Sequence, residues 1–177
     1  MKSDITFITT TLYSKWLTHC YSLVKHHFPE NKHIIINGES GWPETWFTWL
    51  NLLPTIKTDY VVLLDEDCFV IKKHEIENVV QKMMDTNSVL AGVPDAGFAL
   101  RNFNSIAVNP FFLVIDRKQL LYAIQYNPTW RQFRFKEKYA AGAKNPILVN
   151  PNYEIFYCLF WAVLEAGSKI LYLTPTF

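Results

Sequence analysis

A chain of 177 residues is long enough for one domain with a full hydrophobic core. Half of its residues are hydrophobic and 16% are aromatic, a composition that excludes an intrinsically disordered protein. The 17 basic and 16 acidic residues leave a net charge of +1, without the strong basic excess of nucleic-acid-binding proteins, so we expect no nucleic-acid partner.

The N-terminus and the cysteines indicate where the protein works. MKSDITFITTTLY lacks the apolar core and cleavage site of a signal peptide. The longest uncharged apolar run, residues 155–164, is about half of the ~20 residues that span a bilayer, so no transmembrane segment is expected. Three widely spaced cysteines form neither a zinc pattern nor a disulfide framework. We therefore expect buried thiols and a cytoplasmic protein.

Strands and helices alternate through the first half of the sequence. β-branched runs indicate strands and apolar residues at helical spacing indicate helices. We expect strands at residues 4–11, 33–38 and 59–67, and helices at 13–28, 41–53 and 73–87.

The second half continues with strands at 88–94 and 107–116, a helix at 117–126 and a loop-rich segment at 127–151. An apolar helix at 152–167, with Gly167 as its C-cap, precedes a last strand at 169–173. Because the chain ends directly after this strand, we expect a C-terminal segment to be missing.

This order of elements predicts the fold class. Alternating strands and helices favour a three-layer α/β/α sandwich with a mostly parallel central sheet. No linker, repeat or low-complexity segment interrupts the pattern, so residues 1–177 are read as a single domain.

An acidic cluster follows the apolar strand of YVVLLDEDCFV. Ligands of open α/β sheets gather at the carboxyl ends of strands. Alternation along an extended segment would point Asp65 and Asp67 the same way and Glu66 the other way. Two carboxylates on one side suit a hard cation, Mg²⁺ or Mn²⁺, which would bridge to a diphosphate. Phe69 and Val70 are expected to return to the core and hold this loop; the structural alternative is a helix cap or a solvated strand end.

DYVVLLDEDCFV resembles the Asp-x-Asp motif of GT-A glycosyltransferases. The preceding order of strands and helices is similar to that of the family. LAGVPDAGF followed by NPFFLVIDRKQL looks like the acceptor-side segments, and YEIFYCLFWAVLEAGSKILYL like the late helix and strand. The likeness covers most of the chain, and the Asp-x-Asp stretch is its specific part.

The resemblance implies an enzyme that moves a sugar from a nucleotide-diphosphate donor, a UDP- or GDP-sugar, to an acceptor hydroxyl. The acceptor would be a glycan, a lipid-linked molecule or another alcohol. Asp67 would be the main ligand of Mn²⁺ or Mg²⁺, Asp65 a second ligand or a ribose contact, and Glu66 part of the donor site. Many family members take a further ligand from a C-terminal histidine or aspartate, and this chain ends before one.

Other polar residues at strand ends are candidates for donor binding. Hydroxyls and free N–H groups at a helix start suit a nucleotide, and the family places this loop on the base and ribose. Glu39, after the second strand, is either a base or ribose contact or a solvated loop residue. The first strand contributes Thr9, Thr10, Thr11 and Tyr13, for which helix capping is the equal alternative.

Two acidic residues in the second half are catalytic candidates. Asp95 in VPDAGF suits a turn, and its functional reading places it beside the donor sugar. Glu154 opens the late helix, where the helix dipole favours an acidic residue. Its functional reading is a general base that takes the acceptor proton, a position the family often uses.

Two further hypotheses remain open. Haloacid dehalogenase-like phosphatases also have an apolar strand ending in Asp-x-Asp, with the first aspartate, here Asp65, as nucleophile. Phe69 stands where that class carries threonine or valine, and no downstream lysine and paired-aspartate motif appears. The last hypothesis is a GT-A-like domain that binds a nucleotide without turnover.

Overall fold

The computed structural model describes residues 4–39, 42–95, 106–140, 154 and 156–174. The strands are β1 Ile5–Thr11, β2 Lys32–Asn37, β3 Tyr60–Asp65, β4 Ser88–Pro94, β5 Val108–Asp116 and β6 Lys169–Tyr172. The α-helices are α1 Trp16–His27, α2 Trp42–Leu52, α3 Lys73–Thr86, α4 Arg117–Tyr126 and α5 Tyr157–Glu165. Short 3₁₀ helices are η1 Leu53–Thr55, η3 Trp130–Gln132 and η4 Glu137–Ala140. The predicted elements are confirmed, except that β3 ends at Asp65 rather than at residue 67 and that α5 is shorter than the predicted helix.

The strands form one six-stranded sheet in the order β2-β1-β3-β5-β4-β6. The β1–β2, β1–β3 and β4–β6 ladders are parallel, whereas β5 runs antiparallel to both of its neighbours. Five strands therefore point in one direction, and the prediction of a mostly parallel sheet is confirmed.

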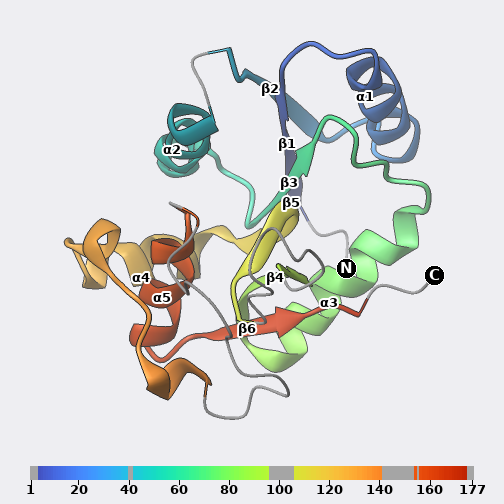
Figure 1. Cartoon of the computed structure of the whole chain (residues 1–177). Coiled ribbons are helices and arrows are strands. Elements are labelled where there is room, and N and C mark those ends of the chain that lie inside the picture. Colours follow the sequence, from blue (N-terminus) through green and yellow to red (C-terminus); the bar gives the residue numbers. More distant parts are fainter. Residues whose placement is uncertain (1–3, 40–41, 96–105, 141–153, 155, 175–177) are drawn as a thin grey trace.

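Helices cover both faces of the sheet, as Figure 1 shows. On one face, apolar residues of α2, α4 and α5 join one hydrophobic cluster, and on the other, residues of α1 and α3 join a second. β3 illustrates the division, because Val61 and Leu63 belong to the first cluster and Val62 and Leu64 to the second. Alternation along a doubly covered strand produces the three predicted layers.

The carboxyl ends of β1, β2 and β3 meet at one edge of the sheet. In register, Thr10 lies beside Asp65 of β3, and Thr11 lies beside Asn37 of β2. The backbone N–H of Gly38 donates to the carbonyl of Thr11 at 2.7 Å and closes the edge of β2 onto β1. Three separate polar segments of the sequence thus become neighbours.

All three cysteines are buried and free, as predicted. Burial raises the pKa of the Cys158 thiol to about 11, which favours the protonated thiol at neutral pH. Within the described ranges, no helix is both long and apolar enough to cross a bilayer.

Candidate functional site

The acidic cluster after β3 is a turn rather than an extended segment. β3 ends at Asp65, and the N–H of Cys68 donates to the Asp65 carbonyl at 2.9 Å. Glu66 and Asp67 are therefore the central residues of a four-residue turn. The prediction that strand alternation aims these side chains is wrong, because the strand geometry stops before Glu66.

The residues after the turn are divided between core and surface. Cys68 and Val70 are buried, and Val70 holds the loop as predicted. Phe69 is 38% exposed and meets the ring of Trp16 at 6.1 Å between centroids. The prediction that Phe69 returns to the core is wrong, because the two buried positions flank it and turn its side chain outward.

A cavity of about 990 Å³ opens at the carboxyl edge of the sheet. Its polar wall comes from the ends of β1 and β3, with the residues Thr10, Thr11, Ser14, Asp65, Glu66 and Asp67. Its apolar wall comes from α2, β3, β5 and the segment before α5, with Trp46, Trp49, Leu63, Pro110 and Phe156. A cavity of this size, with one polar and one apolar wall, suits a ligand that has a polar end and an apolar end.

Glu66 organises the loop between β1 and α1. Its carboxylate accepts hydrogen bonds from the Thr11 hydroxyl, from Ser14 N at 3.0 Å and from Leu12 N at 3.4 Å. Desolvation alone would raise the pKa of Glu66, but these donors prevail and lower it below its ordinary value of 4.5. The side chain thus lines the cavity while its oxygens hold the protein's own loop.

The same hydrogen bonds contradict one expectation about this loop, which is that free N–H groups at the start of α1 bind a nucleotide. Instead, Leu12 N and Ser14 N donate to Glu66, while Tyr13 N donates to Thr11 Oγ1 at 2.7 Å. The loop is a preformed wall of the cavity, and its backbone donors already have acceptors.

Replacing Glu66 with glutamine should lower the free energy of unfolding by about 1–2 kcal/mol at pH 7, because charge-assisted bonds to the loop are weakened. The pKa of Glu66 is depressed on folding, so its contribution is complete above the ordinary 4.5 and is lost as the pH falls through and below it. Urea unfolding at pH 7 and pH 3.5 measures this difference.

Glu30→Gln is the matched control, because Glu30 is an exposed carboxylate outside the cavity and should show little change. Equal stability of Glu66→Gln and wild type at pH 7 would contradict the assigned role.

Asp65 and Asp67 offer oxygen ligands at the mouth of the cavity. Thr10 Oγ1 donates to Asp65 Oδ1 at 2.9 Å, which fixes that side chain across the β1–β3 ladder. Asp67 is exposed. Among the described residues, no group of three or more His, Cys, Asp or Glu side chains could hold a metal by itself. Two carboxylates nevertheless fit Mg²⁺ or Mn²⁺, which commonly take one or two protein carboxylates and complete their shell with phosphate and water.

Some of the remaining candidates from β1 and β2 line the cavity, and others do not. Thr10, Thr11 and Glu39 line it. Thr9 does not, because it is fully buried and its hydroxyl shares a 2.8 Å hydrogen bond with His33 Nε2. Burial, helped by the nearby Lys25 charge, lowers the pKa of His33 to about 4, so this internal pair is neutral at pH 7. Tyr13 is exposed beside the mouth, with a positive φ of 60°.

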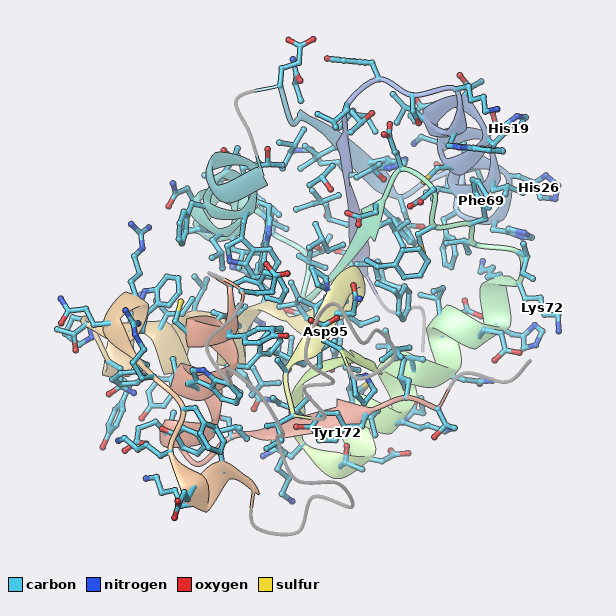
Figure 2. All side chains as sticks on the ribbon, in the orientation of Figure 1. His19, His26, Phe69, Lys72, Asp95 and Tyr172 are labelled. Carbon is cyan, nitrogen blue, oxygen red and sulfur yellow. The ribbon has the colours of Figure 1, made fainter. Side chains whose placement is uncertain are left out.

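Asp95, labelled in Figure 2, is buried at 2% exposure and is not among the residues that line the cavity. Its carboxylate accepts hydrogen bonds from Tyr157 Oη at 2.6 Å and from Asn109 Nδ2 at 3.0 Å. These bonds tie the start of α5 to β5 beside Pro110 and Phe156 of the apolar wall. This placement supports a structural role for the Asp95 carboxylate. It gives no support for a contact between Asp95 and a donor sugar.

Glu154 reaches the cavity from the second half of the chain. It precedes α5 rather than opening it, and its carbonyl accepts the N–H of Tyr157 at 3.1 Å. Its presence among the lining residues places Glu154 of the late segment at the same cavity as Asp65 and Asp67. Helix-dipole stabilisation, the alternative explanation, applies less well to a residue that lies outside the helix.

Sequence reasoning missed several cavity residues. Trp46 and Trp49 are buried core residues that also form the apolar wall. Leu12, Trp16 and Ser14 line the cavity from the β1–α1 loop. For Leu12 and Ser14, the available signal was their position just after the first strand, because ligands of α/β proteins gather at strand ends.

The basic run at residues 131–138 is partly neutralised within the protein. Lys136 Nζ and Lys138 Nζ lie 3.1 and 3.0 Å from Glu165 Oε2. A hydrogen bond from Tyr139, followed by these two lysines, lowers the pKa of Glu165 to about 2. The run therefore fastens η4 to α5, and the structure does not place it at the cavity.

Comparisons with known proteins rest on structure. No family model matches the sequence, and no curated protein sequence matches it. The protein A197 from STIV superposes with a TM-score of 0.57 at 12% identity, over 97% of this chain and 82% of that one. The mannosyltransferase PcManGT from Pyrobaculum calidifontis, in complex with GDP-Man and Mn²⁺, has a TM-score of 0.55 at 9% identity, over 96% and 54%.

A third similar structure is the 2-C-methyl-D-erythritol 4-phosphate cytidylyltransferase from Thermus thermophilus, with a TM-score of 0.53 at 10% identity, over 98% of this chain and 89% of that one. At such identities the likeness shows the fold alone, and that fold is GT-A-like, as the sequence predicted. The chain spans about half the length of the mannosyltransferase.

Proposed function

We propose that this protein is a glycosyltransferase that moves a sugar from a nucleotide-diphosphate donor to an acceptor hydroxyl with the help of Mn²⁺ or Mg²⁺. One observation carries the proposal. Asp65 and Asp67 lie at the end of β3, Glu154 lies far from them in the sequence, and all three line one cavity at the carboxyl edge of a GT-A-like sheet.

The polar wall supports the donor end of the reaction. Asp65, held by Thr10, and the exposed Asp67 supply hard oxygen ligands for a divalent ion. With only two carboxylates, the remaining positions suit diphosphate oxygens and water. A similar fold binds GDP-Man and Mn²⁺ in the mannosyltransferase, which is consistent with this arrangement.

Residues at the edge of β2 support the proposed binding of the nucleoside part of the donor. Glu39 lines the cavity, and its backbone N–H donates to Asn37 Oδ1 at 2.8 Å, which fixes the turn after β2. Its carboxylate accepts a hydrogen bond from Asn37 Nδ2 at 3.1 Å and keeps acceptor capacity for hydroxyl or N–H groups of a ribose or base. Thr11, in contrast, acts through Glu66 on the loop, so we assign it to shaping the site.

The apolar wall and Glu154 support the acceptor end. Trp46 packs against Phe156 at 4.9 Å between ring centroids, which gives a rigid aromatic surface next to Glu154. Aromatic faces suit the apolar faces of sugars, and a carboxylate beside them can take the proton of an attacking hydroxyl. We therefore propose Glu154 as the general base.

Calorimetric titration of UDP, GDP and CMP, each with and without Mn²⁺, tests the proposal. Because the ion would need both protein carboxylates and phosphate oxygens, one nucleoside diphosphate should bind in the presence of Mn²⁺ and poorly without it. Asp67→Asn should weaken this binding by roughly tenfold or more.

Asp85→Asn is the matched control, since Asp85 is an exposed carboxylate at the far end of α3. It should bind like wild type. No binding of any nucleotide, or identical binding by Asp67→Asn, would overturn the proposal. Metal-dependent trapping of beryllium fluoride on Asp65 would support the phosphatase alternative, and nucleotide binding without turnover of any donor would support the non-catalytic one.

A further inference from the structure

A buried hydrogen bond joins the start of α5 to the end of β4. Tyr157 Oη donates to Asp95 Oδ2 at 2.6 Å, across 62 residues of sequence. The two side chains are buried, with exposed fractions of 1% for Tyr157 and 2% for Asp95. A carboxylate loses its hydration when it is buried, and hydrogen bonds to it offset that cost. The proposed reaction assigns no role to this pair.

The β4–β5 ladder holds Asp95 in place. Its backbone N–H donates to the Ala107 carbonyl at 2.8 Å, and Asn109 Nδ2 donates to Asp95 Oδ1 at 3.0 Å. Asn109 is itself fixed, because its Oδ1 accepts the N–H of Phe111 at 2.9 Å. The Asp95 carboxylate is therefore a fixed acceptor on the frame of the sheet.

Tyr157 connects this fixed acceptor to Glu154. The backbone N–H of Tyr157 donates to the Glu154 carbonyl at 3.1 Å, which closes the turn before α5. Glu154 and Phe156 line the cavity, whereas Asp95 and Tyr157 do not. The turn that carries these two cavity residues is thus attached to the sheet by a directional side-chain bond.

Apolar packing alone would place this turn less sharply. Phe156 packs on Trp46 at 4.9 Å between ring centroids, and Tyr157 packs on Trp161 at 6.0 Å. Burial of apolar surface is non-directional, so it resists separation of the two parts more than sliding of one past the other. A hydrogen bond has a narrow range of lengths and angles and therefore fixes their relative position. In some proteins a buried polar pair contributes specificity of placement rather than stability.

We propose that Asp95 is a positioning residue for Glu154 and acts through Tyr157. The catalytic part of this inference rests on the proposed function, because it takes Glu154 as the general base. A base must lie within hydrogen-bond reach of the proton that it accepts, and a displacement of about 1 Å can lower the rate by about 10²-fold. The bond between Asp95 and Tyr157 holds Glu154 within that tolerance.

Tyr157→Phe removes the hydroxyl and keeps the ring in the core. We expect kcat for sugar transfer, measured well below the Tm of the variant, to fall by about 10–100-fold, while the Kd of the nucleotide changes by less than about twofold. The amide N–H at position 157 should exchange with solvent about tenfold faster or more, because its bond to the Glu154 carbonyl opens more often. Asp95→Asn keeps the size of the side chain, weakens the bond and should shift kcat and amide exchange in the same direction.

A double-mutant cycle separates positioning from a general loosening of the fold. If the bond acts through Glu154, Tyr157→Phe should lower kcat little further once Glu154→Gln has removed the base. Tyr139→Phe is the matched control, because Tyr139 Oη donates to Glu165 at the other end of α5 and Tyr139 does not line the cavity. It should leave kcat and the exchange of the amide at position 157 unchanged.

Amide exchange, followed by NMR, gives a result that does not depend on activity. Unchanged exchange in both Tyr157→Phe and Asp95→Asn would overturn the inference whether or not the protein transfers sugar. Faster exchange with wild-type kcat in an active protein would also overturn it, as would a fully multiplicative loss of kcat in the double variant. Faster exchange in a protein that turns over no donor would refute the proposed transferase activity and support the positioning of Glu154.

Discussion

Glu154→Gln is expected to lower the rate of sugar transfer by about 10²–10⁴-fold while leaving the Kd of the nucleotide nearly unchanged. Glutamine keeps the size of the side chain and removes its capacity to accept a proton. Glu154 enters the cavity from the segment before α5, whereas the proposed donor contacts come from β2 and β3. Loss of the base should therefore affect turnover and spare binding.

The measurement pairs initial rates of nucleotide release from the donor with calorimetric Kd values for the same preparations. Glu137→Gln is the control, because Glu137 is an exposed carboxylate of η4 and does not line the cavity. A Glu154→Gln variant with wild-type turnover, or one whose Kd rises as much as its rate falls, would remove Glu154 from the role of base.

Gly92→Ala is expected to destabilise the fold by roughly 2–4 kcal/mol and to lower Tm by about 5–15 °C. A Cβ at this position would lie 2.3 Å from Val108 Cγ1 and 2.7 Å from the backbone oxygen of Phe112. Since the second contact is backbone, β4 and β5 must separate to relieve it. β5 carries Asn109 and Pro110, so the apolar wall of the cavity should loosen as well.

Thermal unfolding followed by circular dichroism checks the prediction, with Gly167→Ala as its control. Gly167 has a positive φ of 73°, but a Cβ there would meet no atom within 4 Å. Replacing it with alanine should lower the free energy of unfolding only by the cost of conformational strain, about 1 kcal/mol. If the two variants were equally stable, close packing of β4 on β5 would not explain the glycine at position 92.

The secondary structure and layers could be predicted because their signals are local. β3 is apolar from Tyr60 to Leu64 since helices cover both of its faces, and α3 shows its buried residues Ile76, Val80 and Met83 at helical spacing. The late helix was predicted too long because its apolar run indicates burial, and burial does not define where a helix begins.

The candidate site could be predicted only in part. The acidic residues after β3 and the threonines after β1 were identified because strand ends of α/β sheets hold ligands, and Thr10 indeed meets Asp65. Thr9 is one residue away, yet it points into the core, where it pairs with His33. Asp95 has a sequence typical of a turn, and its burial beside Tyr157 depends on a contact between distant segments.

The sequence by itself determined the alternation of elements, the doubly covered sheet and the edge at which polar residues collect, since periodicity and strand ends are properties of short segments. The tertiary structure alone decided which carboxylates share a cavity and which groups each one contacts. Glu66 and Asp67 are adjacent in sequence, but Glu66 meets the N–H groups of the β1–α1 loop and Asp67 faces solvent at the mouth. Hydrogen-bond partners from distant segments set the direction of a side chain in a turn, and no local pattern encodes them.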